Sequence, residues 1–298
     1  MTRNDAATDP SLTDRIVAAL DTLGGRSAVA ARRFGPAPKR QLPMASRSDH
    51  GDSFHDHADH EHGVAPLAVE ESVTLHEDDV FPAASLAKLP IAVELLRRAD
   101  MGQFSLNERF DTSAEPRVGG GGVLDYLDPQ TLLTLNDLAF LMIGISDNTA
   151  ANFLLDVVGM GEVNETLNRL NLTHTKLARR FMDWGARASH RDNVTSASDI
   201  LALLALIRGR ALPGATRLRE LLAAQQLADD ITSCLPESAQ LAHKSGSLDG
   251  VFHDAGLLSG PGGSCAYCVL TADQQDVSAA RIAVGRVIRI LWDAWRLD

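Results

Sequence analysis

The chain has 298 residues and a mass of 32.0 kDa, which is enough for one large domain or two interleaved subdomains. Its net charge of -11 and its pI near 5.3 argue against nucleic acid or an anionic membrane surface as partners. No uninterrupted apolar stretch reaches about 18 residues, the length that a membrane-spanning helix needs, so we expect no membrane partner.

The N-terminus and the cysteines bear on location. Residues 1–10 contain no apolar segment of the kind found in secretion signals. The three cysteines, Cys234, Cys265 and Cys268, do not make a disulfide framework. We therefore expect a cytoplasmic protein as the chain stands, and a periplasmic or secreted one if the native N-terminus is longer. A redox pair at 265 and 268 is disfavoured because two such positions on a strand point to opposite faces.

The N-terminal part begins with a predicted helix at 14–23, which Ser11 or Thr13 can cap. Two β-prone runs follow, at 27–34 and 68–75.

Between these runs lies a polar, His-rich insert at 36–65. Four of its histidines are interleaved with carboxylates and form a candidate metal site: His55, His57, His60 and His62. Such a cluster could bind zinc, copper or nickel, but composition favours a solvated loop, and we expect no metal to be required.

The middle of the chain is helical by pattern, with an irregular segment at 173–193. The predicted helices lie at about 85–96, 136–145 (capped by Thr134), 150–158, 162–170, 196–207 (capped by Thr195) and 215–224. The C-terminal part then changes character. Short strands are predicted at 240–244, 251–258 and 265–271, joined by hairpin signals, and a last helix at 277–295.

This order predicts a fold of the α/β (α+β) class. The five strands can pool into one antiparallel sheet covered by the first and last helices, which gives a three-layer sandwich, and the remaining helices form a lobe. We expect residues 1–80 and 208–298 to build the sheet subdomain and residues 81–207 the helical subdomain. A cleft between the two is a natural site.

Three short motifs carry chemistry. Ser85 and Lys88 share a helical face, so a lysine kept out of water could remove the serine proton, and unpaired N–H groups at the helix start suit an oxyanion. Ser146-Asp147-Asn148 follows an apolar helix and by itself predicts a turn. Lys244-Ser245-Gly246 offers a cation, a hydroxyl and a backbone that another group can approach closely.

In this order, and separated by 61 and 98 residues, the three motifs resemble the S-x-x-K, S-D-N and K-T/S-G set of the penicillin-recognising serine hydrolases, and most closely the class A β-lactamases. The stretch 244–257 is also similar to that family. The resemblance covers about residue 27 to the C-terminus without the insert. It implies the same three-layer sandwich with a helical lobe, no cofactor, and a small-molecule amide or ester substrate; we expect a monomer.

The resemblance also implies a role for each matching residue. Ser85 would be the nucleophile and Lys88 its base, while Ser146 would pass a proton to the leaving nitrogen. Lys244 would hold the Ser146 hydroxyl and the substrate carboxylate in a positive field. Substrate contacts would come from the Asn148 side chain to an amide, from Ser245 to a carboxylate, from Gly246 by close approach, and from the N–H groups of Ser85 and Ser247 to the oxyanion.

One departure concerns deacylation. Class A β-lactamases carry a glutamate on an Ω-shaped loop that activates the hydrolytic water, and residues 177–192 contain no glutamate. Arg179 or Arg180 can close this loop by an ion pair with Asp192. Asp183 is the nearest carboxylate and a candidate base, although it could equally pair with Arg180 or Arg187.

The sequence therefore predicts a β-lactamase-like serine hydrolase that opens β-lactam amides through an acyl-Ser85 intermediate, with slow deacylation. A D-alanyl-D-alanine peptidase, a penicillin-binding protein or an esterase is the alternative within the same chemistry. A catalytically retired scaffold with a metal-binding His-rich loop is the alternative outside it. The presence of Ser85, Lys88, Ser146 and Lys244 together argues against retirement, because the four have no common structural use.

Overall fold

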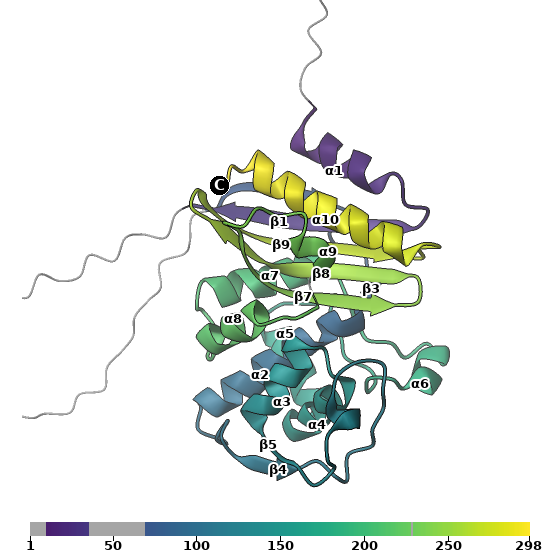
Figure 1. Ribbon diagram of the computed structural model, residues 1–298, viewed down its shortest axis with the longest axis vertical. Helices are drawn as coiled ribbons and strands as arrows, with labels where there is room; N and C mark the ends of the chain where they lie inside the picture. The colour runs from purple at the N-terminus through teal and green to yellow at the C-terminus, as the bar shows by residue number, and fades with distance from the viewer. Residues whose placement is uncertain (1–9, 36–68, 228) are drawn as a thin grey trace, which may run out of the picture.

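The computed structural model describes residues 10–35, 69–227 and 229–298. Within them a single five-stranded sheet separates two groups of helices (Figure 1). The His-rich insert, with the candidate metal ligands at 55, 57, 60 and 62, lies outside the described residues.

The sheet is antiparallel throughout and has the order β2-β1-β9-β8-β7. Its strands are β1 (Arg26–Phe34), β2 (Val69–Leu75), β7 (Gln240–Leu248), β8 (Val251–Gly260) and β9 (Gly263–Ala272). The predicted five-stranded sheet is therefore confirmed. The N- and C-terminal strands meet where β1 pairs with β9 in the middle of the sheet, and β7 is left as an edge.

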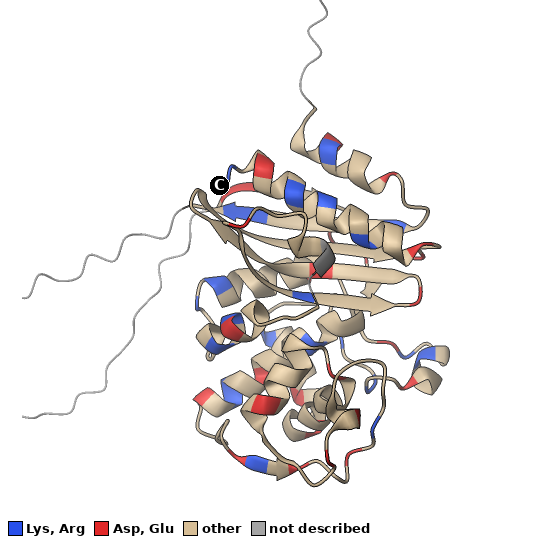
Figure 2. Cartoon of the chain, viewed as in Figure 1, with Lys and Arg blue, Asp and Glu red and all other residues tan. Residues whose placement is uncertain are grey.

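One face of the sheet is covered by α1 (Leu12–Leu20) and α10 (Val277–Ala294), which lie together above it in Figure 1. A capping box between Ser11 and Asp14 starts α1. Alternate strand residues, such as Val29, Ala31 and Val269, pack against apolar residues of α10 and are buried. Figure 2 shows blue Lys and Arg segments along the outer side of α10.

The other face is covered by α7 (Ala197–Arg208) and α8 (Ala215–Ala223), which pack on β9 and β7. Beyond them lie most of the remaining helices: η1 (Ala84–Ala87), α2 (Lys88–Asp100), η2 (Leu124–Tyr126), α3 (Leu135–Gly144), α4 (Asn148–Val158), α5 (Met160–Arg169) and α6 (Trp184–Ala188). The short helix α9 (Asp229–Thr232) instead packs against α10 on the opposite face of the sheet. A second apolar core, which includes six residues of α2, fills the helical layer and the space between it and the sheet.

Four short strands complete the described structure. β3 (Phe81–Pro82) pairs with β6 (Val194–Thr195), and β4 (Arg109–Asp111) pairs with β5 (Leu132–Thr134). The β3–β6 pair lies directly before η1 and directly after the irregular loop at 173–193. It therefore fixes the two segments that bring Ser85 and the loop together.

Two local expectations need correction, and one is confirmed. Ser196, not Thr195, caps α7, because its Oγ accepts the Asp199 N–H at 3.2 Å while the Thr195 hydroxyl faces that of Thr175. The irregular loop contains the short helix α6. Cys265 and Cys268 belong to the cores on opposite faces of β9, as expected.

None of the described helices combines the length and the apolar character that crossing a bilayer requires.

Candidate active site

Ser85 lies in η1, one turn before α2, and edge strand β7 runs close beside it. A Cβ atom at Gly246 would come within 3.0 Å of the Ser85 backbone nitrogen and 3.1 Å of Ala84 Cβ, so only glycine allows this approach. Ala84 has a positive φ of 47°, a backbone conformation unusual for an L-residue. The turn that presents Ser85 is thus held in an uncommon conformation by its surroundings.

Lys88 begins α2 and is completely buried. Its Nζ lies within hydrogen-bond distance of four oxygen atoms: Ser146 O at 2.6 Å, Asn148 Oδ1 at 2.7 Å, Ser146 Oγ at 3.1 Å and Ser85 Oγ at 3.3 Å. An ammonium has only three N–H groups and cannot serve all four. The longest contact, to Ser85, is the one that a neutral amine can use to accept a proton.

Burial lowers the pKa of Lys88 well below its usual range, the positive charge of Lys244 lowers it further, and the carboxylate of Asp147 acts in the opposite direction. Within the described residues, Lys88 forms no hydrogen bond to a carboxylate. The ring of Phe181 has its centroid 4.9 Å from Nζ, a contact that by itself favours the charged amine. Burial and the charge of Lys244 act in the other direction and favour the free amine that a general base requires.

Ser146 connects the two motifs. Its backbone has a positive φ of 59°, and its Oγ donates to Ser85 Oγ at 2.9 Å. Asp147 holds this turn in place, because Oδ1 accepts the Ala150 N–H and caps α4 while Oδ2 accepts the N–H groups of Val123 and Leu124. The motif that by itself predicts a capped turn thus also positions a hydroxyl next to Ser85.

Asn148 bridges Lys88 and the glycine-rich loop at 119–122. Its Oδ1 accepts from Lys88 Nζ, and its Nδ2 donates to Gly119 O at 2.9 Å. Gly120 has a φ of 73°, and a Cβ atom there would lie 2.5 Å from the end of Met182. The loop therefore packs against both the Asn148 amide and the loop at 173–193.

Lys244 and the residues after it lie on β7. The Lys244 side chain is completely buried, and burial lowers its pKa to about 7, although Asp254 opposes the shift. Its Nζ donates to Ser245 O at 2.9 Å. Ser245 is buried and contacts the Gln225 side chain, whereas Ser247 is exposed and lines the cavity described below.

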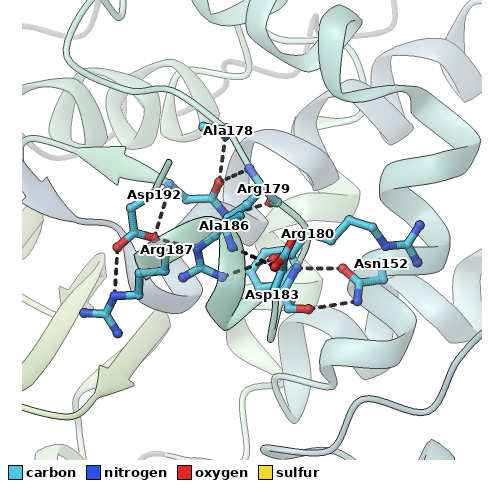
Figure 3. Close-up of polar contacts among 10 residues, drawn as sticks. Asn152, Ala178, Arg179, Arg180, Asp183, Ala186, Arg187 and Asp192 are labelled. Atoms are coloured by element: carbon cyan, nitrogen blue, oxygen red, sulfur yellow. Dashed lines mark hydrogen bonds and ion pairs between the residues drawn. The ribbon is translucent and has the colours of Figure 1, made fainter. Parts of the chain in front are cut away.

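The loop at 173–193 is closed by the expected ion pair. Arg179 Nε lies 2.7 Å from Asp192 Oδ1, and Arg187 Nε lies 3.1 Å from Oδ2 of the same carboxylate (Figure 3). Both groups of the main pair are largely shielded from solvent, which strengthens the interaction. Arg180 points elsewhere and pairs with Glu115 and Asp156.

Asp183 belongs to the same loop, but its side chain does not face Ser85. Asp183 is exposed, and its Oδ1 caps α6 by accepting the Ala186 N–H at 2.9 Å (Figure 3). It is not among the residues that line the cavity beside Ser85. Phe181, two positions earlier, occupies the place next to Lys88, and its backbone is held by the Asn152 amide at 2.8 and 3.1 Å. This geometry does not support Asp183 as a base that activates water.

A cavity of about 240 Å³ opens beside Ser85. Its lining residues are Ala84, Ser85, Gly120, Asn148, Arg179, Phe181, Met182, Trp184, Asn193, Ser247 and Leu248. In the described part of the chain, larger cavities lie between α8 and β7 and between α1 and α10, and they contain none of the expected site residues. The cavity at Ser85 is therefore the one that joins reactive groups to a binding space.

Sequence reasoning missed two residues of this site, Phe181 and Gln225. Phe181 lies two residues after Arg179, the arginine that closes the loop. Its position relative to that arginine was a signal in the sequence, whereas the search for the nearest carboxylate led to Asp183. Gln225 belongs to no motif and lies 20 residues from its partner Ser245, so no signal in the sequence pointed to it.

Comparison with known proteins gives a consistent family. The model of the β-lactamase enzyme family matches residues 59–295. The β-lactamase regulatory protein BlaB of Streptomyces cacaoi is 26% identical over 290 residues, which cover 78% of this chain and 91% of that protein. A β-lactamase of Rhodobacter capsulatus is 29% identical over 154 residues, 46% of this chain and 47% of that one.

Solved structures agree. The β-lactamase from Sphaerobacter thermophilus DSM 20745 superposes with a TM-score of 0.79 at 27% identity and covers 96% of this chain and 97% of its own. The structure of PBP-A, with a TM-score of 0.74, 24% identity and 96% of both chains covered, shows the same fold. The resemblance read from the three motifs is thereby confirmed. Because the family model spans most of its length, the chain belongs to the β-lactamase enzyme family and is a serine hydrolase of the β-lactamase type.

Proposed function

We propose that this serine hydrolase opens β-lactam amide bonds through an acyl-enzyme on Ser85, and that the acyl-enzyme is released slowly. The observation that carries the proposal is the position of Ser85 Oγ, 2.9 Å from Ser146 Oγ and 3.3 Å from the buried Nζ of Lys88. A nucleophile in contact with a deprotonated amine and a second hydroxyl is the arrangement that acyl transfer requires.

In the acylation step, neutral Lys88 accepts the Ser85 proton and Oγ attacks the lactam carbonyl carbon. The backbone N–H groups of Ser85 and Ser247 stabilise the oxyanion, since Gly246 lets β7 approach η1 closely. Collapse of the tetrahedral intermediate breaks the C–N bond, and Ser146 Oγ delivers a proton to the leaving nitrogen.

The remaining motif residues bind substrate in this proposal. Asn148 contacts the side-chain amide of the substrate, while Lys244 and Ser245 face its negatively charged end. The apolar loop residues Phe181 and Trp184 contact the acyl side chain in the cavity.

Deacylation needs a water molecule and a base to activate it. Phe181, which cannot accept a proton, lies against Lys88, and Asp183 is engaged in capping α6. The acyl-enzyme then persists, because nothing in this constellation activates water efficiently.

A D-alanyl-D-alanine peptidase, a penicillin-binding protein or an esterase is the second candidate, and Phe181 next to Lys88 favours it. Acylation by a peptide or ester uses the same residues, and a site without an activated water suits transfer to another acceptor. Faster turnover of a simple ester or an acyl-D-alanyl-D-alanine peptide than of a cephalosporin would identify this activity.

The first test is mass spectrometry of the intact protein after mixing with benzylpenicillin or a chromogenic cephalosporin, with absorbance following ring opening. We expect a lasting adduct of one β-lactam per chain in the wild type and none in Ser85→Ala. Many turnovers with only a transient adduct would contradict slow deacylation. An adduct of equal extent in Ser85→Ala would refute Ser85 as the nucleophile.

A further inference from the structure

Gln225 lies just after α8 with its side chain against the edge strand β7, and it is only 8% exposed. When the amide oxygen faces β7, it accepts the Ser245 N–H at 2.7 Å and the Ser245 O–H at 3.0 Å. The amide nitrogen then donates to Ile143 O at 2.6 Å. This orientation satisfies both ends of the amide, whereas the opposite one would set N–H against N–H.

The contacts of Gln225 leave Ser245 without a free donor. Its backbone N–H and its hydroxyl proton both point to the same amide oxygen, so neither is available to another acceptor without displacing Gln225. A carboxylate that arrived here would have to break two hydrogen bonds before forming its own. The cost would be substantial because Ser245 is itself buried.

Lys244, in contrast, has N–H groups to donate but only one well-placed acceptor. Its Nζ donates to Ser245 O at 2.9 Å, and the Gln225 amide atom 3.3 Å away is, in the satisfied orientation, a nitrogen with no lone pair to offer. Among the described residues, no arginine hydrogen bonds to Lys244, Ser245 or Gln225. Lys244 is therefore the cation that the β7 motif itself places at this end of the site.

We propose that Gln225 is the specificity-determining residue at this end of the site, and that its amide occupies the Ser245 donors that a substrate carboxylate would otherwise use. This rests on the proposed function of Ser85 and its neighbours. It follows that Lys244 alone attracts a substrate carboxylate here, so the protein prefers the acid to its neutral ester less strongly than it would if the Ser245 donors were free.

The test uses noncovalent binding, so that it does not depend on acylation. Calorimetry on the Ser85→Ala protein would measure the Kd of benzylpenicillin and of its methyl ester, with Gln225 intact and with Gln225→Ala added. We expect the acid to bind roughly tenfold more tightly once Ala frees the Ser245 donors, and the ester to change little. An acid-to-ester ratio of Kd values that stays the same would overturn the proposal.

Gln225→Glu should change the affinity for the acid in the opposite direction, and it tests the proposal even if the Ala variant fails to fold. Its carboxylate keeps the acceptor for Ser245, pairs with Lys244 and repels a second carboxylate, so the acid should bind at least tenfold more weakly while the ester is spared. Gln225→Glu also loses the bond to Ile143 O. A purely structural role of that bond would therefore weaken both ligands equally, which would contradict the proposal.

Gln226→Ala is the matched control, because this neighbouring glutamine is exposed and its side chain, within the described residues, hydrogen bonds only to Ala224 O at 2.8 Å. It should leave both Kd values unchanged. Adduct formation in proteins that retain Ser85 tests the acyl-enzyme separately from the role of Gln225. Absence of any adduct would refute the acyl-enzyme, while the ratio of Kd values would still decide the role of Gln225.

Discussion

Two buried lysines, Lys88 and Lys244, have different protonation tendencies in the same site. Burial is the main cause of the lowered pKa in both, but the charge of Lys244 lowers the pKa of Lys88 further, while Asp254 partly restores that of Lys244. One amine is thus prepared to accept a proton and the other keeps its charge to about neutral pH. Neighbouring groups whose pKa values are driven apart are a means of assigning base and electrostatic roles.

The strongly lowered pKa of Lys88, together with the pKa of about 7 for Lys244, predicts a bell-shaped pH dependence of acylation. The rate constant should rise as Lys88 loses its proton, and fall above about pH 7 as Lys244 becomes neutral and no longer attracts an anionic substrate. Stopped-flow acylation by benzylpenicillin between pH 5 and 10 measures both limbs. Lys244→Arg keeps the charge at all these pH values and should remove the falling limb. A falling limb that is unchanged in this variant would assign it to another group.

At the scale of elements, the loop between Leu177 and Asp192 determines what stands beside the acyl-enzyme. Its closure by an ion pair with Asp192 was predicted from the sequence, but the choice between Arg179 and Arg180 was left open and only the structure assigns the pair to Arg179. The side chain that faces the interior of the loop could not be predicted. It depends on the capping of α6 by Asp183 and on the hydrogen bonds between the Asn152 amide and the Phe181 backbone. These contacts arise only in the folded chain.

Phe181→Glu should convert this loop into one that supports hydrolysis. The new carboxylate would replace the ring next to Lys88 and could orient and deprotonate a water molecule, for which general bases contribute about 100-fold or more. The lifetime of the benzylpenicillin adduct, followed by mass spectrometry, should shorten accordingly.

Phe181→Gln is the control for that substitution, because it has nearly the same shape as Glu and no basic group. Equal acceleration in the Gln variant would mean that opening space for water, rather than supplying a base, limits deacylation.

The strands and helices themselves were largely predictable. Thr134 caps α3 as its sequence indicates, and the run at 27–34 forms β1 within one residue. The C-terminal end of β7 was not predictable, because Ser245, Gly246 and Ser247 have neither strand propensity nor apolar alternation. Pairing with β8 extends the strand through them, and this extension is what aligns the candidate site with η1.

At the scale of the whole molecule, the site lies where the edge of the sheet meets the helical layer, so its charged groups are buried between two apolar structures. The sequence predicted both layers, since strand and helix periodicities are local. It could not give the burial of Lys88 and Lys244, which are completely enclosed only because sheet and helices meet. Burying charged groups in a binding site lowers the free energy of unfolding, because a desolvated ammonium disfavours the folded state.

Lys244→Met should therefore abolish acylation and yet stabilise the fold. The folded-state pKa of about 7 lies below the value of 10.5 in the unfolded chain, so the unfolded state binds more protons between these values and wild-type stability rises with pH across this window. Met carries no proton, and the stability advantage of the variant should be largest near pH 7 and narrow by about 3 kcal/mol toward pH 9.5. Urea unfolding of both proteins across this range measures the difference, in which other titrating groups largely cancel. An advantage that is absent at pH 7, or that does not change with pH, would show that Lys244 is charged and fully compensated in the folded protein.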